Sequence, residues 1–235
     1  MVRLSGGKNG VGLGVAALLK ANPQQADRVK TALISALEKQ GAEHDRSVKE
    51  GQGMSEGFLN FWVDLAEAVA ALQDPRAAKG LLMAVMSHAP SAVEGLADIC
   101  PAIVDSIIAR AHEPEMYFLG ASLGVRTQAI GVLGNCLRRP GASFSPDAAS
   151  KIRRELMTAA DDPDSGVRAL AVFALMPLRA EPEVQAKLRT LAATDPYVSL
   201  ADGTRDGASR FSVREAAARA LDPPDRKSTR LNSSH

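Results

Sequence analysis

The chain has 235 residues and carries 28 Lys and Arg against 27 Asp and Glu, a formal net charge of +1 at neutral pH. Its hydrophobic content of 46% is that of a globular protein and excludes the disordered class. No apolar run approaches the ~20 residues that a helix needs to cross a bilayer, so we expect a soluble protein without a membrane-spanning segment. Aromatic residues make up only 4%, which favours an all-α fold over a sheet.

The first segment, residues 1–10, is expected to be flexible, and a first helix is expected at 11–21. Five glycines between residues 6 and 14 invite comparison with a phosphate-binding loop. However, no Ser or Thr follows Lys8 and no strand precedes it. The segment also lacks the small-x-small cleavage site of a signal peptide. The sequence therefore predicts neither a nucleotide site nor a cleaved leader here.

Apolar residues at helical spacing then predict five helix pairs. The first and second helices of these pairs span 24–40 with 56–72, 75–87 with 91–99, 101–113 with 123–138, 147–160 with 165–178, and 182–194 with 211–222. A proline stands at or just before the start of each first helix, where its missing N–H group costs nothing: Pro23, Pro75, Pro101, Pro146 and Pro182. Helical spacing also assigns one aromatic cluster to the core between helices: Phe58, Phe61, Trp62 and Leu65.

One phrase occurs three times in the second helices of these pairs. It starts at Val125, Val167 and Val213, with separations of 42 and 46 residues, and reads Val-Arg-x-x-Ala-x-x followed by Val or Ala and then Leu. These positions fall on one helical face. The phrase resembles the second helix of a HEAT repeat, a family whose period is ~40–47 residues. Asp162-Pro163 resembles the turn that this family places between the two helices of a repeat.

The resemblance implies a right-handed α-solenoid of about five antiparallel helix pairs, which we expect to form one domain over residues 11–224. Each Arg of the phrase is then a repeat-signature residue with a structural role: Arg126, Arg168 and Arg214. The family often carries an Asp a few residues before the Val-Arg dipeptide, and only Asp164 fills that place here. We therefore expect no continuous ladder of Asp and Arg.

The last eleven residues, 225–235, read DRKSTRLNSSH and resemble the in-frame translation of a sequencing-library adapter. We interpret them as a non-native tail of a bacterial metagenomic fragment, and we expect the natural chain to continue beyond residue 224. Without the tail, the formal net charge changes to about −1. A chain of near-zero charge has no global reason to bind nucleic acid.

The two cysteines, Cys100 and Cys136, form no CxxC pair and no zinc-binding spacing. Each lies in an apolar helical context, so we interpret both as core residues without a redox role. A disulfide between them requires that adjacent repeats bring them together. Without a disulfide the chain suits a reducing compartment, and a cytoplasmic location is the default expectation.

No residue pattern predicts catalysis. The native histidines, His44, His88 and His112, do not lie in an HExxH motif or at zinc-binding spacing with cysteines, so we expect no metal, no cofactor and no enzyme activity. Stacked helix pairs create extended surfaces, and the leading hypothesis is a protein–protein interaction scaffold. Two alternatives stay open: an enzyme that resembles the phycobilin-lyase-like HEAT-repeat proteins, and a nucleic-acid-binding HEAT-like solenoid.

Three long insertions indicate where a partner binds. Segments 41–55, 114–122 and 195–210 all lie inside a helix pair, and in a solenoid such insertions emerge on one edge. They contain residue types that are enriched at interface hot spots, which are the candidate partner-binding residues: Met116, Tyr117, Phe118, Tyr197, Arg205 and Arg210. The alternative is that Tyr117 and Phe118 fold back over the helix ends.

Overall fold

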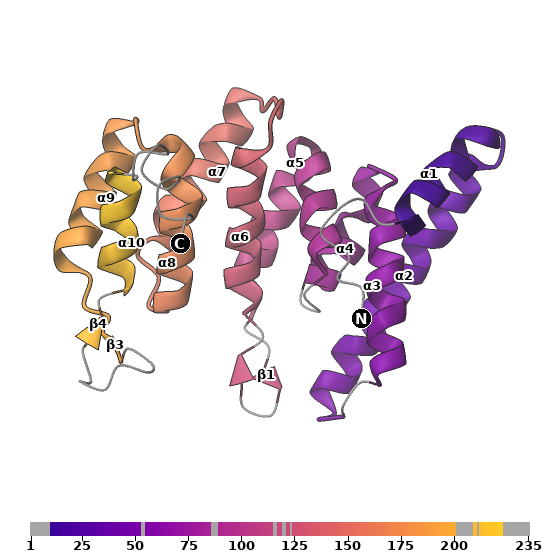
Figure 1. The fold of residues 1–235 in the computed structure, drawn as a ribbon, viewed down its shortest axis with the longest axis horizontal. Coiled ribbons are helices and arrows are strands. Elements are labelled where there is room, and N and C mark those ends of the chain that lie inside the picture. Colours follow the sequence, from indigo (N-terminus) through magenta and orange to yellow (C-terminus); the bar gives the residue numbers. More distant parts are fainter. Residues whose placement is uncertain are drawn as a thin grey trace, which may run out of the picture. The chain divides into compact units, whose positions relative to one another are not determined.

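The computed structural model describes residues 10–52, 55–85, 89–114, 117–118, 121–122, 124–200, 209–210 and 212–222. These residues are almost entirely helical (Figure 1), which confirms the all-α prediction. Contacts divide the chain into two compact units, Met1–Ala149 (unit 1) and Ser150–His235 (unit 2). No helix in the described ranges is long and apolar enough to cross a membrane. The predicted flexible start, except Gly10, and the adapter-like tail lie outside the described residues.

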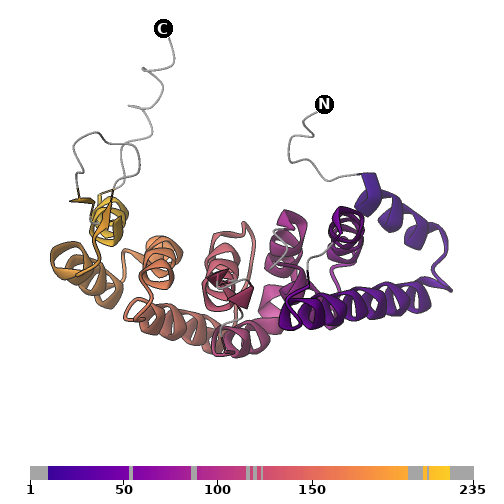
Figure 2. The ribbon, with the colours of Figure 1, turned by 90° about the horizontal axis from the view of Figure 1, so that it is seen from below.

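Unit 1 contains six complete α-helices and one short hairpin among its described residues. The elements are α1 (Gly10–Ala21), α2 (Ala26–Lys49), α3 (Glu56–Ala70), the 3-10 turn η1 (Pro75–Ala77), α4 (Ala78–Val85), α5 (Pro90–Ala111), β1 (Tyr117–Phe118), β2 (Ala121–Ser122) and α6 (Val125–Arg138). Each helix packs against those near it along the chain. α3 contacts α1, α2, α4 and α5, and α5 contacts α4 and α6. Figure 2 shows α2 lengthwise, in indigo and purple.

The core of unit 1 lies between these helices and consists of large apolar side chains without solvent exposure. Its fully buried members include Leu37, Trp62, Leu81, Leu96, Ile107 and Leu133. Trp62 and Leu65 are buried as the sequence predicts, but Phe61 is 55% exposed and does not belong to the core. Some helices approach so closely that only glycine fits. A Cβ added to Gly95 of α5 would lie 2.5 Å from the Cβ of Ala70 in α3.

α2 is longer than the sequence predicts. We expected the helix to end near residue 40 and an insertion to follow at 41–55, but the helix continues to Lys49. Its buried residues keep helical spacing over the whole length: Ile34, Leu37, Gly41, His44 and Val48. Glycine often marks the end of a helix, but Gly41 lies inside α2, where α4 packs closely on it. A Cβ added to Gly41 would lie 2.9 Å from the terminal methyl carbon of Met83 in α4. The predicted insertion is therefore mostly helix.

α5 replaces two predicted helices with one. We expected helices at 91–99 and 101–113 with Pro101 starting the second, but α5 is unbroken from Pro90 to Ala111. A proline inside a helix costs about 3 kcal/mol or more, and the buried stripe that continues across Pro101 offsets this cost: Leu96, Ile99, Cys100, Ile103, Val104 and Ile107. The four helices expected between residues 75 and 138 are thus three in the structure: α4, α5 and α6. The predicted pairing of these helices is therefore wrong.

A disulfide joins α5 to α6. Cys100 and Cys136 are bonded, with their Cα atoms 5.9 Å apart, and both side chains are fully buried. Their place in the core is confirmed, and the condition for a disulfide, that packed helices bring the two residues together, is met. The close packing of α5 on α6 brings together two positions 36 residues apart. Arg139, just after α6, forms an ion pair with Asp98 of α5.

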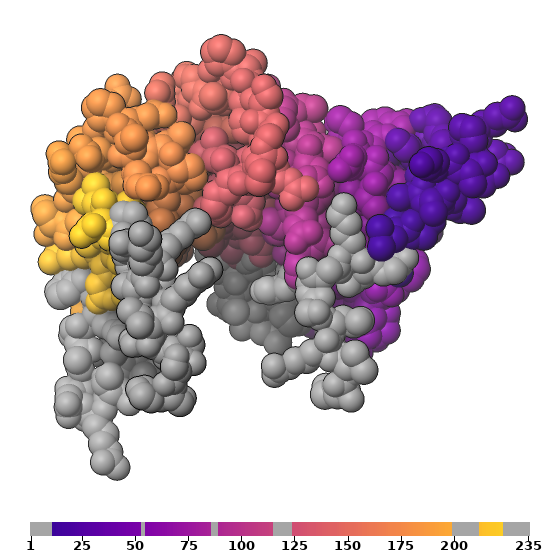
Figure 3. All heavy atoms as spheres, turned by 45° about the horizontal axis from the view of Figure 1, so that its top comes forward, coloured from indigo at the N-terminus to yellow at the C-terminus, as the bar shows by residue number. Residues whose placement is uncertain are grey.

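The first turn of α1 forms a hydrogen bond to α3. The backbone N–H of Gly12 donates to Oε1 of the buried Glu67 in α3, at 3.3 Å. A carboxylate therefore meets the positive end of the α1 dipole. α1 belongs to the indigo end of the surface in Figure 3 and leaves several apolar side chains exposed along its length: Val11, Leu13 and Leu18.

Unit 2 follows the sequence prediction closely. Its elements are α7 (Pro146–Ala159, which begins in the last residues of unit 1), α8 (Ser165–Leu175), the 3-10 turn η2 (Met176–Leu178), α9 (Pro182–Thr194), β3 (Ser199–Leu200), β4 (Ser209–Arg210) and α10 (Ser212–Leu221). The observed helix bounds differ from the predicted ones by at most about three residues. α10 packs on both α8 and α9, and the buried side chains include Ile152, Leu156, Leu175, Leu188 and Val213.

Two short antiparallel hairpins occupy two of the predicted insertions. In the first, Tyr117 pairs with Ser122 and Phe118 pairs with Ala121. In the second, Ser199 pairs with Arg210 and Leu200 pairs with Ser209. Each ladder is only two residues long, so the hairpins leave the helical character of both units unchanged.

Candidate interaction site

The turn that follows α9 is organised by one buried ion pair. Arg168 of α8 donates from Nε to Oδ2 of Asp195 at 2.7 Å and from Nη2 to Oδ1 at 3.1 Å. Such a two-point contact fixes the orientation of both groups. Asp195 is 3% exposed and Arg168 is 9% exposed, so the pair is shielded from water. It fixes the chain where α9 ends and the insertion 195–210 begins.

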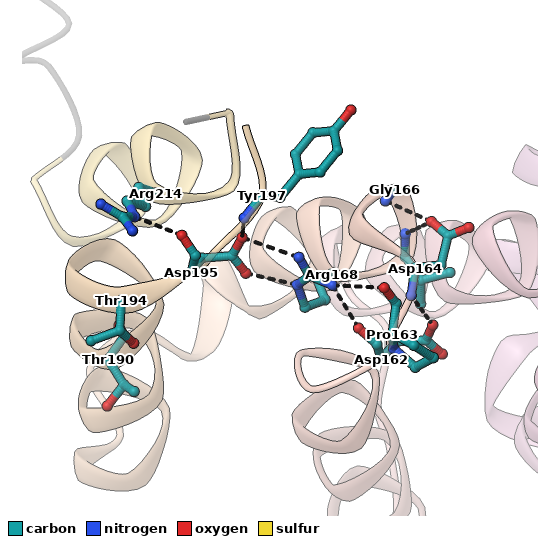
Figure 4. Close-up of polar contacts among 11 residues, drawn as sticks. Asp162, Pro163, Asp164, Gly166, Arg168, Thr190, Thr194, Asp195, Tyr197 and Arg214 are labelled. Atoms are coloured by element: carbon teal, nitrogen blue, oxygen red, sulfur yellow. Dashed lines mark hydrogen bonds and ion pairs between the residues drawn. The ribbon is translucent and has the colours of Figure 1, made fainter. Parts of the chain in front are cut away.

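Arg168 also holds the turn between α7 and α8. Its Nη1 donates to the backbone carbonyl oxygens of Asp162 and Pro163, at 2.8 Å and 3.0 Å. One guanidinium group therefore joins the turn after α7 to the turn after α9, as Figure 4 shows. These contacts use the fixed fork of donors that distinguishes arginine from lysine.

Asp195 also accepts hydrogen bonds from Tyr197 and Arg214. Its Oδ1 accepts the backbone N–H of Tyr197 at 3.0 Å, and its backbone carbonyl oxygen accepts Nε of Arg214 in α10 at 2.6 Å. Burial acts to raise the pKa of Asp195, but the hydrogen bonds from Arg168 and Tyr197 and the charges of Arg168 and Arg214 outweigh it. The pKa of Asp195 therefore lies below its ordinary value.

Asp164, which fills the Asp position of the repeat family, caps α8. Its Oδ1 accepts the backbone N–H groups of Gly166 and Val167, at 2.7 Å and 3.2 Å. It is therefore the N-cap of α8 and satisfies two N–H groups that have no partner within the helix. The carboxylate that pairs with Arg168 comes from Asp195, in the turn after α9.

A second repeated phrase in the sequence marks the position of Asp195. Ala-Ala-x-Asp-Pro occurs at 159–163, where α7 ends, and again at 192–196, where α9 ends. Asp195 thus corresponds to Asp162, but an insertion separates it from the next Val-Arg dipeptide at 213–214. No Asp stands a few residues before this dipeptide, so the family's spacing indicates no Asp partner for Arg214. In the structure, Nε of Arg214 donates to the backbone carbonyl oxygen of Asp195.

Unit 1 repeats the same arrangement in its sequence and backbone. Glu113-Pro114 follows α5, as Asp195-Pro196 follows α9. β1 begins three residues after Pro114, and β3 begins three residues after Pro196. In both units the hairpin leads into a helix that carries the Val-Arg dipeptide. Among the described residues, each unit therefore contains one hairpin, placed between an acidic-Pro turn and a Val-Arg helix.

Tyr197 lies at the edge of a surface hollow in unit 2. The hollow has a volume of about 470 Å³ and is lined by Pro163, Asp164, Ser165, Arg168, Pro196 and Tyr197. Tyr197 is 39% exposed and the adjacent Val198 is 44% exposed. In Figure 4 the ring of Tyr197 extends away from the polar contacts around Asp195. An aromatic side chain is thus exposed on a backbone that a buried ion pair holds in place.

The other predicted binding residues are located only in part. Met116 and Arg205 lie outside the described residues. The backbones of Tyr117 and Phe118 form β1 and that of Arg210 lies in β4, so the alternative that these aromatic rings cover helix ends stays a prediction. The valines of the repeated phrase are all buried: Val125, Val167 and Val213. Arg126 is the second residue of α6 and directly follows Val125, whereas Arg168 is the fourth residue of α8 and directly follows Val167.

Within the described ranges, no group of three or more His, Cys, Asp or Glu side chains is placed to hold a metal ion. His44 is buried in unit 1, where its ring lies 4.5 Å from that of Trp62. His112 follows the last residue of α5, and His88 lies outside the described residues. His44 therefore belongs to the packing between α2 and α3.

Compared with known families, curated proteins and solved structures, this chain has no significant match.

Proposed function

We propose that the chain is a non-catalytic protein-interaction module built from HEAT-like helical repeats, arranged as an α-solenoid. The insertions that follow the acidic-Pro turns, 114–122 in unit 1 and 195–210 in unit 2, bind the partner protein. The third predicted insertion, 41–55, is not part of the proposed binding surface, because most of it belongs to α2.

The exposed Tyr197 on a fixed backbone is the observation that carries this proposal. Tyrosine is enriched among the residues that dominate interface energies. A side chain whose backbone is already fixed loses less conformational entropy on binding. Asp195 provides that fixation, since it accepts the Tyr197 N–H and is itself held by Arg168. A buried ion pair placed next to an exposed aromatic residue favours a binding role over a purely structural turn.

The repeated position of the hairpins supports the same proposal independently. In solenoid proteins, insertions in individual repeats collect on one face, which is often the binding face. The two hairpins follow the same acidic-Pro turn and precede the same Val-Arg helix. No specific observation on the described residues favours the enzyme or the nucleic-acid alternative.

Affinity capture followed by mass spectrometry tests the proposal. The full chain serves as bait in an extract of cells that carry the natural gene. The double variant Tyr117→Ala with Tyr197→Ala is expected to recover the partner at least ~30-fold less well, since truncating a hot-spot residue costs about 2 kcal/mol or more. Circular dichroism should show unchanged helicity. Equal recovery of the partner by the double variant would contradict the proposal.

Phe173→Ala provides the matched control. Phe173 is an aromatic residue of α8 in the same unit and is 44% exposed, close to the 39% of Tyr197. It lies on a helix and outside both insertions. This variant should recover the partner as well as the unmodified chain, so a loss that is shared with Phe173→Ala would indicate a general effect on the surface of unit 2.

A further inference from the structure

The disulfide between Cys100 and Cys136 bears on where this protein works. The two residues lie in α5 and α6, and their Cα atoms are 5.9 Å apart. This separation lies within the range that disulfides adopt. Both cysteines are 0% exposed, so the bond is part of the core of unit 1.

A second contact aligns the same two helices at the same level. Asp98 lies two residues before Cys100, and Arg139 lies three residues after Cys136. These two residues form an ion pair. The ion pair and the disulfide therefore connect α5 and α6 side by side. The register that brings the sulfur atoms together does not depend on the disulfide alone.

Burial restricts when the bond can form. An oxidoreductase cannot reach two sulfur atoms that are fully covered, so oxidation has to occur while α5 and α6 are still apart or opening. A cysteine thiolate attacks the disulfide of an oxidising dithiol catalyst and forms a mixed disulfide, and the second cysteine then displaces the catalyst. The protein loses two protons and two electrons, and the catalyst becomes a dithiol.

We infer that this protein folds and acts in an oxidising compartment, where the Cys100–Cys136 disulfide closes the segment from α5 to α6. Such compartments contain disulfide-forming catalysts, whereas the cytosol keeps thiols reduced. The inference replaces the default expectation of a cytoplasmic location, which assumed free cysteines. The closed segment contains the β1–β2 hairpin, so the bond also fixes the two helices on either side of it.

Thiol labelling of the full chain tests the bond itself. The chain is produced with an added export leader for the bacterial periplasm, denatured without reductant and treated with iodoacetamide. Intact mass should show no adduct, and prior reduction should give two. Two adducts on folded, exported protein without reductant would overturn the inference.

Thermal unfolding tests whether the fold depends on the bond. Reduction should lower the transition of unit 1 by roughly 10 °C, as expected for a structural disulfide that closes a loop of this length. The variant Cys100→Ala with Cys136→Ala should have the melting temperature of the reduced chain, and reductant should not change it. If that variant fails to fold, the reduced unmodified chain still decides the outcome. A reduced chain that melts within about 2 °C of the oxidised one would show that the fold suits a reducing compartment equally well, against the inference.

Discussion

Arg168 and Asp195 form a two-point ion pair that joins the turn after α7 to the turn after α9. The two residues are 27 positions apart, fewer than the 42 and 46 residues between successive Val-Arg dipeptides, because Asp195 follows α9 and does not lie beside the next dipeptide. The pair links the ends of two helices of unit 2 and fixes the base of the second hairpin. Its removal should affect both stability and the order of the turn at Tyr197.

Asp195→Ala should destabilise unit 2 by about 3 kcal/mol, because it leaves the buried guanidinium group of Arg168 without its carboxylate. Chemical denaturation gives the free energy of unfolding, and hydrogen exchange locates the loss in the turns around residues 162 and 195. The matched control is Asp161→Ala. Asp161 also forms an ion pair, with Lys187, but its side chain is 65% exposed, so the cost should be below ~1 kcal/mol. Equal losses in the two variants would show that burial is unimportant here.

The same carboxylate predicts how stability depends on pH. The pKa of Asp195 in the folded chain lies below the value of 3.8 expected for the unfolded chain, so protonation favours unfolding. Its contribution is fully present above about pH 5 and is lost as the pH falls through the folded pKa. Denaturation between pH 7 and pH 2 measures this. In Asp195→Asn the free energy of unfolding should fall less steeply as the pH decreases. An identical pH dependence in that variant and the unmodified chain would contradict the assignment.

The N-cap of α8 gives a separate prediction. Asp164→Ala should cost about 1 kcal/mol, because the N–H groups of Gly166 and Val167 lose their acceptor. Asp164→Asn keeps an acceptor oxygen and should retain most of the stability. Thermal unfolding of both variants is sufficient. If the two substitutions cost the same, charge near the helix dipole rather than the cap hydrogen bonds would explain the effect.

The close contact between α3 and α5 predicts opposite effects for two glycines. Gly95→Ala places a Cβ 2.5 Å from that of Ala70, so the helices have to separate, at a cost of about 2 kcal/mol. Gly57 lies in the first turn of α3, and a Cβ there meets no atom within 4 Å. Gly57→Ala should therefore stabilise the chain by up to ~1 kcal/mol through helix propensity. The two free energies of unfolding should change in opposite directions, and a stabilising Gly95→Ala would contradict the packing.

Local signals were sufficient to predict the helices of unit 2. Pro146 and Pro182 mark helix starts, and the Val-Arg phrase marks α8 and α10. These signals act within a few residues of the boundary that they set, so one sequence contains enough information to place it. The all-α class follows from the same patterns.

Unit 1 and the candidate site depended on contacts between distant residues. Pro101 is a local stop signal, but the apolar face on both sides of it packs against neighbouring helices and keeps α5 continuous. The partner of Cys100 lies 36 residues away and that of Arg168 lies 27 residues away. Their pairing depends on the order and packing of whole helices. The repeated Ala-Ala-x-Asp-Pro was the one sequence signal that could have identified Asp195 in advance.

Photo-cross-linking from position 197 tests the proposed binding role most directly. A benzophenone amino acid replaces Tyr197 in the full chain, or replaces Phe173 as the control, and each protein is irradiated in an extract of cells that carry the natural gene. Because both side chains are similarly exposed, at 39% and 44%, nonspecific collisions should label them equally. A binding role for the insertion 195–210 predicts one discrete protein adduct from position 197 and none from position 173. The same adducts from both positions, or none from position 197 while the partner is bound, would contradict it.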